Sequence, residues 1–186
     1  MKRCILAFAI LGAWISTTWA DQFSLNINGN SAEVDYIMDM NGRLGYQGEG
    51  NYQTFVRILH RRNTLWRAGF SLLGSLENAE SFQVGGGLEG VFGSDYIATP
   101  LFVRLSYVLP LNDPIPLTRL SGRIAYAPSV LSFSDANQFT AYRLELDTQI
   151  VPRFHLYTGY RHINSDYKTH DRLFDHSWYG GIRFYF

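Results

Sequence analysis

The chain has little cysteine and little lysine. Its 186 residues include one cysteine, Cys4, and two lysines, Lys2 and Lys168. Beyond Cys4 there is no thiol left for a disulfide, a nucleophile or a metal site. After the first 20 residues no apolar run approaches the ~20 residues that a transmembrane helix needs. Any role in a membrane must therefore use β-strands.

The first residues have the pattern of a secretory signal peptide. Lys2 and Arg3 precede an apolar run over residues 4–15, and Ala20 lies before Asp21. A membrane-anchoring helix is the alternative, but the run is too short to span. We expect residues 1–20 to be removed and residues 21–186 to form one domain. Without Lys2 and Arg3 the 16 basic residues fall to 14, against 16 acidic residues, so no basic field for nucleic acid remains.

The remaining chain alternates with a period of two residues and contains no convincing helix. Ten segments of this kind are separated by Gly, Asn, Asp, Pro or Ser. They are residues 22–28, 33–40, 52–60, 64–73, 82–92, 97–109, 119–127, 139–151, 153–163 and 177–186. Most have the ~9–11 residues that cross a bilayer as a tilted strand. The pattern predicts an all-β fold, a closed antiparallel up-and-down transmembrane barrel. It has ten strands, or eight if 22–28 and 33–40 form a hairpin that does not span.

Arginine recurs on one predicted face of the strands, opposite apolar and aromatic residues. We predict that this face lines the lumen, and its residues are Arg57, Arg67, Arg104, Arg123, Arg143, Arg161, Arg183, Glu89, Glu145 and Asp147. Glu33, Asp35 and Asp39 join them if the first hairpin is part of the wall. A soluble barrel, with its apolar side chains inside, would show the same period. The signal peptide, the scarcity of cysteine and the aromatic C-terminus favour the membrane form.

The last ten residues, SWYGGIRFYF, are similar to the C-terminal signal of bacterial outer-membrane barrels. The signal-like positions are Tyr179, Gly181, Phe184 and Phe186. This resemblance implies recognition by the barrel-assembly machinery and a place in the outer membrane of a Gram-negative cell, in contact with its lipid. We expect Phe184 and Phe186 to act in sorting and in closing the barrel.

Residues 121–163 resemble the YfaZ-like family of small outer-membrane proteins. The similarity lies in a Tyr-Ala-Pro element, a Leu-Ser pair and a Gly-Tyr-Arg strand. These are Tyr126, Ala127, Pro128, Leu131, Ser132, Gly159, Tyr160 and Arg161. The resemblance implies a porin-like barrel and says nothing of the solute or partner.

Other motifs carry little chemistry. His162 to Ser165 is similar to the His-x-Ser-Asn element of lipid A deacylases, but the order differs, and on a strand Ser165 would point away from His162. The connection over 164–176 holds His170 and His176 with aspartates, a composition that is usually a solvated loop. The glycines of Val84 to Gly90 are followed by no phosphate-loop lysine. We expect no catalytic site, metal or cofactor.

The expected loops and lumen leave three functions open. Counting from a periplasmic C-terminus, the long connections 128–138 and 164–176 lie outside the cell and the tight turn 151–153 in the periplasm, as is usual for such barrels. The first function, which the YfaZ-like resemblance favours, is a narrow polar channel for small solutes, with anion preference if the arginines outnumber their partners. The second is a plugged structural or adhesive barrel, if the charges pair. The third is a lipid A-modifying enzyme.

Overall fold

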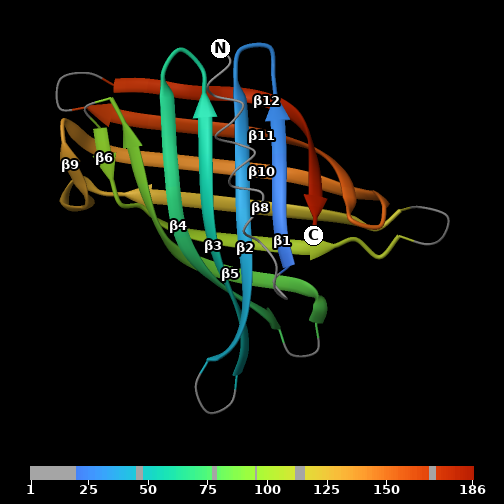
Figure 1. Cartoon of the computed structure of the whole chain (residues 1–186). Helices are drawn as coiled ribbons and strands as arrows, with labels where there is room; N and C mark the ends of the chain where they lie inside the picture. The colour runs from blue at the N-terminus through green and yellow to red at the C-terminus, as the bar shows by residue number, and fades with distance from the viewer. Residues whose placement is uncertain (1–19, 45–47, 77–78, 95, 112–115, 168–170) are drawn as a thin grey trace.

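The wall of the molecule is a closed ring of ten antiparallel strands. The computed structural model describes residues 20–44, 48–76, 79–94, 96–111, 116–167 and 171–186 (Figure 1). The wall strands are β1 (Ala20–Ile27), β2 (Ala32–Leu44), β3 (Gly48–His60), β4 (Thr64–Leu76), β5 (Ala79–Gly93), β7 (Leu101–Val108), β8 (Thr118–Ala127), β10 (Ala136–Val151), β11 (Phe154–Tyr167) and β12 (Asp171–Tyr185). Each wall strand pairs with its neighbour in the chain, and β1 with β12 closes the ring.

The all-β barrel prediction is confirmed, with ten strands rather than eight. The first two predicted segments belong to the wall, because β1 pairs along its length with both β2 and β12, and β2 continues the sheet to β3. The structure divides the predicted segment 97–109 into β6 (Tyr96–Ala98) and β7. Pro100, which has no N–H for a strand ladder, lies between them.

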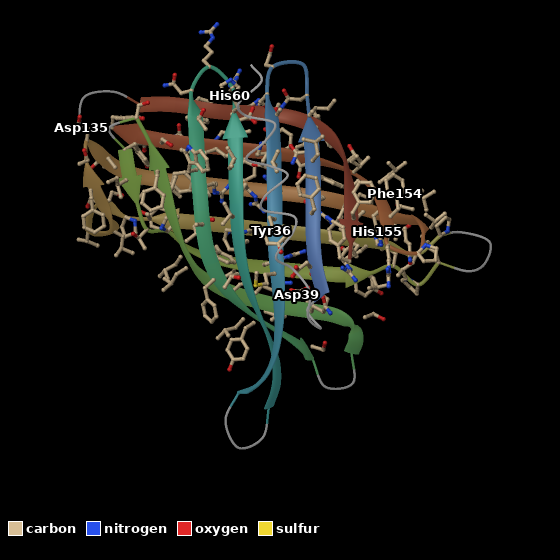
Figure 2. The ribbon with its side chains drawn as sticks, in the orientation of Figure 1. Tyr36, Asp39, His60, Asp135, Phe154 and His155 are labelled. Atoms are coloured by element: carbon tan, nitrogen blue, oxygen red, sulfur yellow. The ribbon has the colours of Figure 1, made fainter. Side chains whose placement is uncertain are left out.

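The two ends of the barrel differ, and we name them by their connections. The terminal end holds the start of β1, the end of β12 and the turn between β10 and β11. The hairpin end holds the turns at 28–31 and 61–63. In Figure 2, His155 lies toward the terminal end, whereas His60 lies at the hairpin end. At the hairpin end β6 and β9 (Ser132–Ser134) extend the sheet beyond β5, and the 3₁₀ turn η1 (Ser129–Leu131) leads into β9.

The predicted long loop over 164–176 is mostly strand, so that prediction is wrong. Strand β11 continues to Tyr167 and β12 begins at Asp171, with a register shift between Ile163 and Asn164. The polar composition of residues 164–176 suggested a loop, although strands β11 and β12 continue through most of this segment. The connection over 128–138 likewise contains η1, β9 and the start of β10. The predicted signal peptide lies outside the described residues except for Ala20, which begins β1.

The outward face of the wall is apolar. Exposed side chains include Val103 at 55%, Ile124 at 64%, Leu144 at 51% and Trp178 at 69% of their full area. Rings also meet across neighbouring strands on this face, as where Phe154 and Phe184 lie 5.0 Å apart between centroids. None of the helical segments in the described residues is long and apolar enough to cross a membrane.

Two glycines let tyrosine rings lie flat against the inner wall. Gly181 is paired with Tyr157, and Gly159 with Tyr179, across the β11–β12 ladder. A Cβ at Gly181 would lie 2.6 Å from the Tyr157 ring, and one at Gly159 would lie 2.7 Å from the Tyr179 ring. Any larger residue at either glycine would displace the facing ring. This reciprocal arrangement fixes two tyrosines inside the barrel beside the charged groups described next.

Candidate functional site in the barrel interior

The hairpin end of the interior is filled by an apolar core. Leu59, Val91, Phe139 and Ile163 are fully buried, and Leu65 is 1% exposed. They come from β3, β4, β5, β10 and β11, so the core reaches across the barrel. Strand β6 contributes to the same cluster through Tyr96, whose hydroxyl donates to the carbonyl of Gln138 at 2.8 Å. The interior is therefore closed to water at this end.

A layer of ion pairs lies next to the apolar core, and Glu33 is at its centre. This carboxylate is 0% exposed. It pairs with Arg143, lies 3.0 Å from Arg161, and lies 3.9 Å from Arg57. The amide of Asn26 donates to it at 3.0 Å. One carboxylate from β2 thus holds arginines from three other strands.

Asp175 and Asp35 complete this part of the network. Arg161 pairs with Asp175 at 2.6 Å, and Arg57 donates to Asp35. Arg161 is 1% exposed and also donates to Ser31 at 3.1 Å. Asp175 is not among the lumen residues predicted from the sequence, because residues 164–176 were expected to form a loop. The sequence does contain a signal for Asp175, which is separated from Tyr179 and Arg183 by even numbers of residues. The three side chains therefore share the inward face of β12.

Two further groups of charges line the rest of the interior. Glu89 accepts from Arg67 at 2.6 Å and from Arg123 at 2.7 Å. Arg183 pairs with both Glu145 and Asp147. The Nδ1 atom of His155, a residue that was not predicted to line the lumen, lies 2.6 Å from Asp147. The Tyr179 hydroxyl donates to Glu145 at 3.0 Å.

The cross-strand register brings four arginines into one row. Arg104 faces Arg123, Arg123 faces Arg143, and Arg143 faces Arg161 across successive strand pairs. Like charges directly opposite one another destabilise a sheet. The carboxylates of the opposite wall and the faces of aromatic rings offset this repulsion, as where Arg123 lies 3.9 Å from the Phe102 ring centroid.

Arg104 is the exception in this row. Among the described residues it has no carboxylate within 4.0 Å, whereas the six other predicted lumen arginines each have at least one. Those six are Arg57, Arg67, Arg123, Arg143, Arg161 and Arg183. Asp39, the predicted anion on β2, has no ion pair of this length within the described residues either. The other predicted lumen residues, apart from Arg104 and Asp39, each take part in an ion pair within the described part of the chain.

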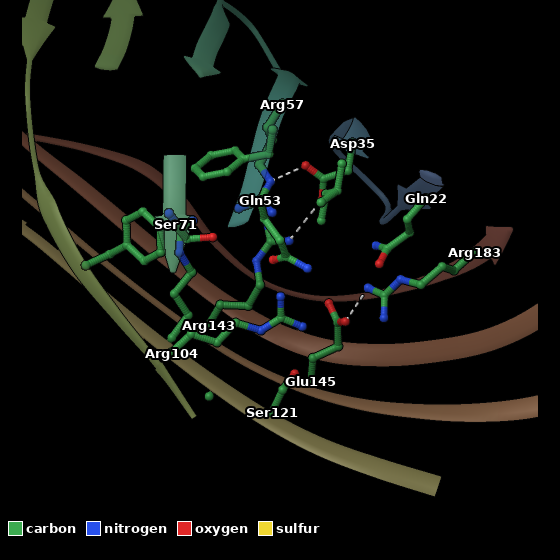
Figure 3. A pocket seen from close by; sticks show the side chains of 15 residues that line it. Gln22, Asp35, Gln53, Arg57, Ser71, Arg104, Ser121, Arg143, Glu145 and Arg183 are labelled. Atoms are coloured by element: carbon green, nitrogen blue, oxygen red, sulfur yellow. Dashed lines mark hydrogen bonds and ion pairs between the residues drawn. The ribbon is translucent and has the colours of Figure 1, made fainter. Parts of the chain in front are cut away.

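A cavity of about 50 Å³ lies beside Arg104 (Figure 3). Its charged lining consists of Arg57, Arg104, Arg123, Arg143, Arg183, Asp35 and Glu145. Figure 3 shows that both carboxylates are already paired. Asp35 accepts a hydrogen bond from Arg57, and Glu145 accepts one from Arg183. The cavity is large enough for a few water molecules and too small for a continuous channel.

The signal-like residues of the C-terminus lie at the seam between β12 and β1. Phe186 is 69% exposed, and its backbone N–H donates to the carbonyl of Asp21 at 2.9 Å. Phe184 points outward, and Tyr179 and Gly181 face the interior. Phe186 therefore supplies a hydrogen bond that joins the end of β12 to the start of β1 at the seam.

The two residues considered for catalysis, His162 and Ser165, lie on opposite faces of the barrel wall. His162 lies on the outer face, stacked on Tyr142 with 4.7 Å between ring centroids, and it neighbours His176. Ser165 is 1% exposed and faces the interior. Within the described residues, no group of three or more His, Cys, Asp or Glu side chains could hold a metal ion.

The comparisons with known proteins agree with a porin-like barrel fold. No family model and no curated protein matches the chain, so the YfaZ-like resemblance stays a proposal. Among solved structures the chain is similar to the KdgM porin in complex with disordered oligogalacturonate. The identity is 7% and the TM-score 0.51, over 90% of this chain and 99% of that one. A chain from work on the in-meso crystallisation of membrane proteins has 13% identity and a TM-score of 0.45, over 91% and 83%.

Proposed function

We propose that the protein is an outer-membrane β-barrel with a closed lumen, acting as a structural or adhesive barrel and without catalytic activity. The observation that carries the proposal is the filled interior. An apolar core occupies the hairpin end, and paired charges occupy the layer next to it. Planar guanidinium groups hold carboxylates firmly, and breaking such buried pairs is costly. The resting barrel therefore offers no open path to solutes.

Three observations support the place in the membrane. The outward face is apolar around the ring, as a face that contacts lipid must be. Every wall strand is paired on both sides, which satisfies the backbone in a medium without water. The sequence begins with a signal-peptide pattern and ends on an outer-membrane-type signal. The YfaZ-like resemblance fits the same location.

A narrow channel for small anions is the second candidate. It is favoured by the cavity, where five arginines meet two carboxylates and Arg104 has no ion pair with any described residue. Rings of positive charge favour anions in pores. The KdgM porin, whose fold is similar, forms a complex with disordered oligogalacturonate. Conduction would require the apolar core around Phe139 to move.

Bilayer recording separates the two candidates. We expect the refolded barrel, residues 21–186, to give no discrete conductance steps in a planar bilayer under a potassium chloride gradient. Steps with an anion-selective reversal potential would support the channel, and they should lose selectivity in Arg104→Gln. Heat-modifiable migration on a gel serves as the control that the silent protein is folded.

Deleting Phe186 should impair assembly. The deletion removes an aromatic signal residue and the hydrogen bond from its N–H to Asp21, so insertion into the outer membrane should fall several-fold and protein should collect in the periplasm. Fractionation followed by immunoblotting measures the distribution. Phe186→Tyr, which keeps a ring and the backbone bond, is the matched control. Unchanged insertion of the deletion variant would refute a sorting role for this residue.

A further inference from the structure

The arginines of β7 and β8 have too few acidic partners. Arg104 and Arg123 are directly opposite one another in the ladder, and Arg67 reaches the same carboxylate as Arg123. Arg67 and Arg123 therefore share Glu89, and Arg104 beside them has no carboxylate within 4.0 Å among the described residues. Their position inside the barrel makes this local excess of positive charge costly, because charges removed from water require partners.

The carboxylates that could compensate are already engaged. Glu145 lines the cavity, but it pairs with Arg183 and accepts from the Tyr179 hydroxyl. Asp35 pairs with Arg57. Asp39 forms no ion pair within 4.0 Å of Arg104 or of any other cation in the described part of the chain. Arg104 thus has no close ion pair with an acidic side chain of the described residues, and Glu145 and Asp39 act on it only from beyond 4.0 Å.

Two of the arginines that line this cavity each have a donor without an acceptor. Nη1 of Arg57 and Nε of Arg183 are buried and have no hydrogen-bond partner among the described residues. Both arginines line the cavity with Arg104. Their residues are 7% and 6% exposed, so solvent cannot satisfy them freely. Several N–H groups around one partly enclosed cavity, lined by five arginines and two carboxylates, are the chemistry of an anion site.

We propose that the cavity holds one small oxyanion, of the phosphate, sulfate or carboxylate class, bound between Arg104 and Arg123. A volume of about 50 Å³ suits a group of this size, and guanidinium forks match its oxygens in two-point fashion. The anion serves as a fixed counterion that balances the arginine row. Because the apolar core blocks the hairpin end, the anion enters from the terminal end. The site is independent of whether the barrel conducts.

Phosphate titration of the refolded barrel tests the site. We use residues 21–186 in an uncharged detergent, with inorganic phosphate added at constant ionic strength and sodium chloride making up the balance. Tryptophan fluorescence follows urea unfolding. The wild-type midpoint should rise with phosphate and then level off, because a ligand that binds only the folded state stabilises it by mass action. Calorimetry should give one phosphate per barrel.

The variants decide whether Arg104 is the ligand. Arg104→Gln should fold, since it leaves no carboxylate without its partner, and its midpoint should not respond to phosphate. Arg104→Lys, which keeps the charge and loses the fork, should respond at a several-fold higher concentration. Arg153→Gln, in the exposed turn between β10 and β11, should respond as the wild type does. An equal response in Arg104→Gln, or no saturable response in the wild type, would overturn the proposal.

Discussion

Leu144→Arg should lower the free energy of unfolding of the barrel by about 2–4 kcal/mol, because the new charge would face hydrocarbon near the bilayer midplane. Leu144 lies at the middle of β10, points outward and is 51% exposed. Urea unfolding of the refolded variant in lipid vesicles measures the change.

Thr140→Arg is the matched control for this effect. Thr140 is on the same strand and the same outward face, four residues before Leu144 and closer to the hairpin end. An arginine there reaches the interface, where the cost falls to about 0–1 kcal/mol. Equal losses at the two positions would contradict the assignment of the outer face to lipid.

Glu33→Gln should produce the largest loss, on the order of 3–5 kcal/mol, because it removes one partner of a buried ion network. Arg143 and Arg161 would then lack their shared carboxylate at the centre of the interior. Gln keeps the size of the side chain and one acceptor, so the loss reports charge rather than packing. Urea midpoints and heat-modifiable migration provide the measurement.

Arg104→Gln is the internal comparison for that result. It also removes one charge from the barrel interior, but from a half-buried residue without an ion pair to any described residue, and it relieves the repulsion with Arg123. In phosphate-free buffer we expect its stability to match or exceed that of the wild type. If Arg104→Gln and Glu33→Gln were equally destabilised, the pairing described for the interior would be incorrect.

Period-two alternation was sufficient to predict the faces of the strands. It placed Arg57, Arg143 and Arg183 on the inward side because a strand side chain has only two directions to take. Alternation carries no information about depth along the barrel or about register. The apolar core around Leu59 and Phe139 shares the inward face with the arginines, and only the pairing of strands shows that the two kinds of residue occupy different levels.

Some interior residues were not predicted from the sequence, and each case has a physical reason. Asp175 lies in a stretch whose aspartates and histidines suggest a loop, although β12 continues through it. His155 follows a tight turn, a position typical of an interfacial aromatic residue. In the structure its Nδ1 instead lies beside Asp147 in the interior. The row from Arg104 to Arg161 could not be foreseen, since it depends on three successive registers, each of which would be broken by a slip of one residue.

The central position of Glu33 bears on the order in which the barrel can form. Its partners Arg143 and Arg161 lie on β10 and β11, on the other side of the β1–β12 seam. A growing sheet that lacked either half would expose an unmatched carboxylate and several unmatched guanidiniums to lipid. Such contacts between distant parts of a chain slow folding and make it cooperative. Partly inserted intermediates of this barrel are therefore penalised electrostatically, and closure should occur as a single late event.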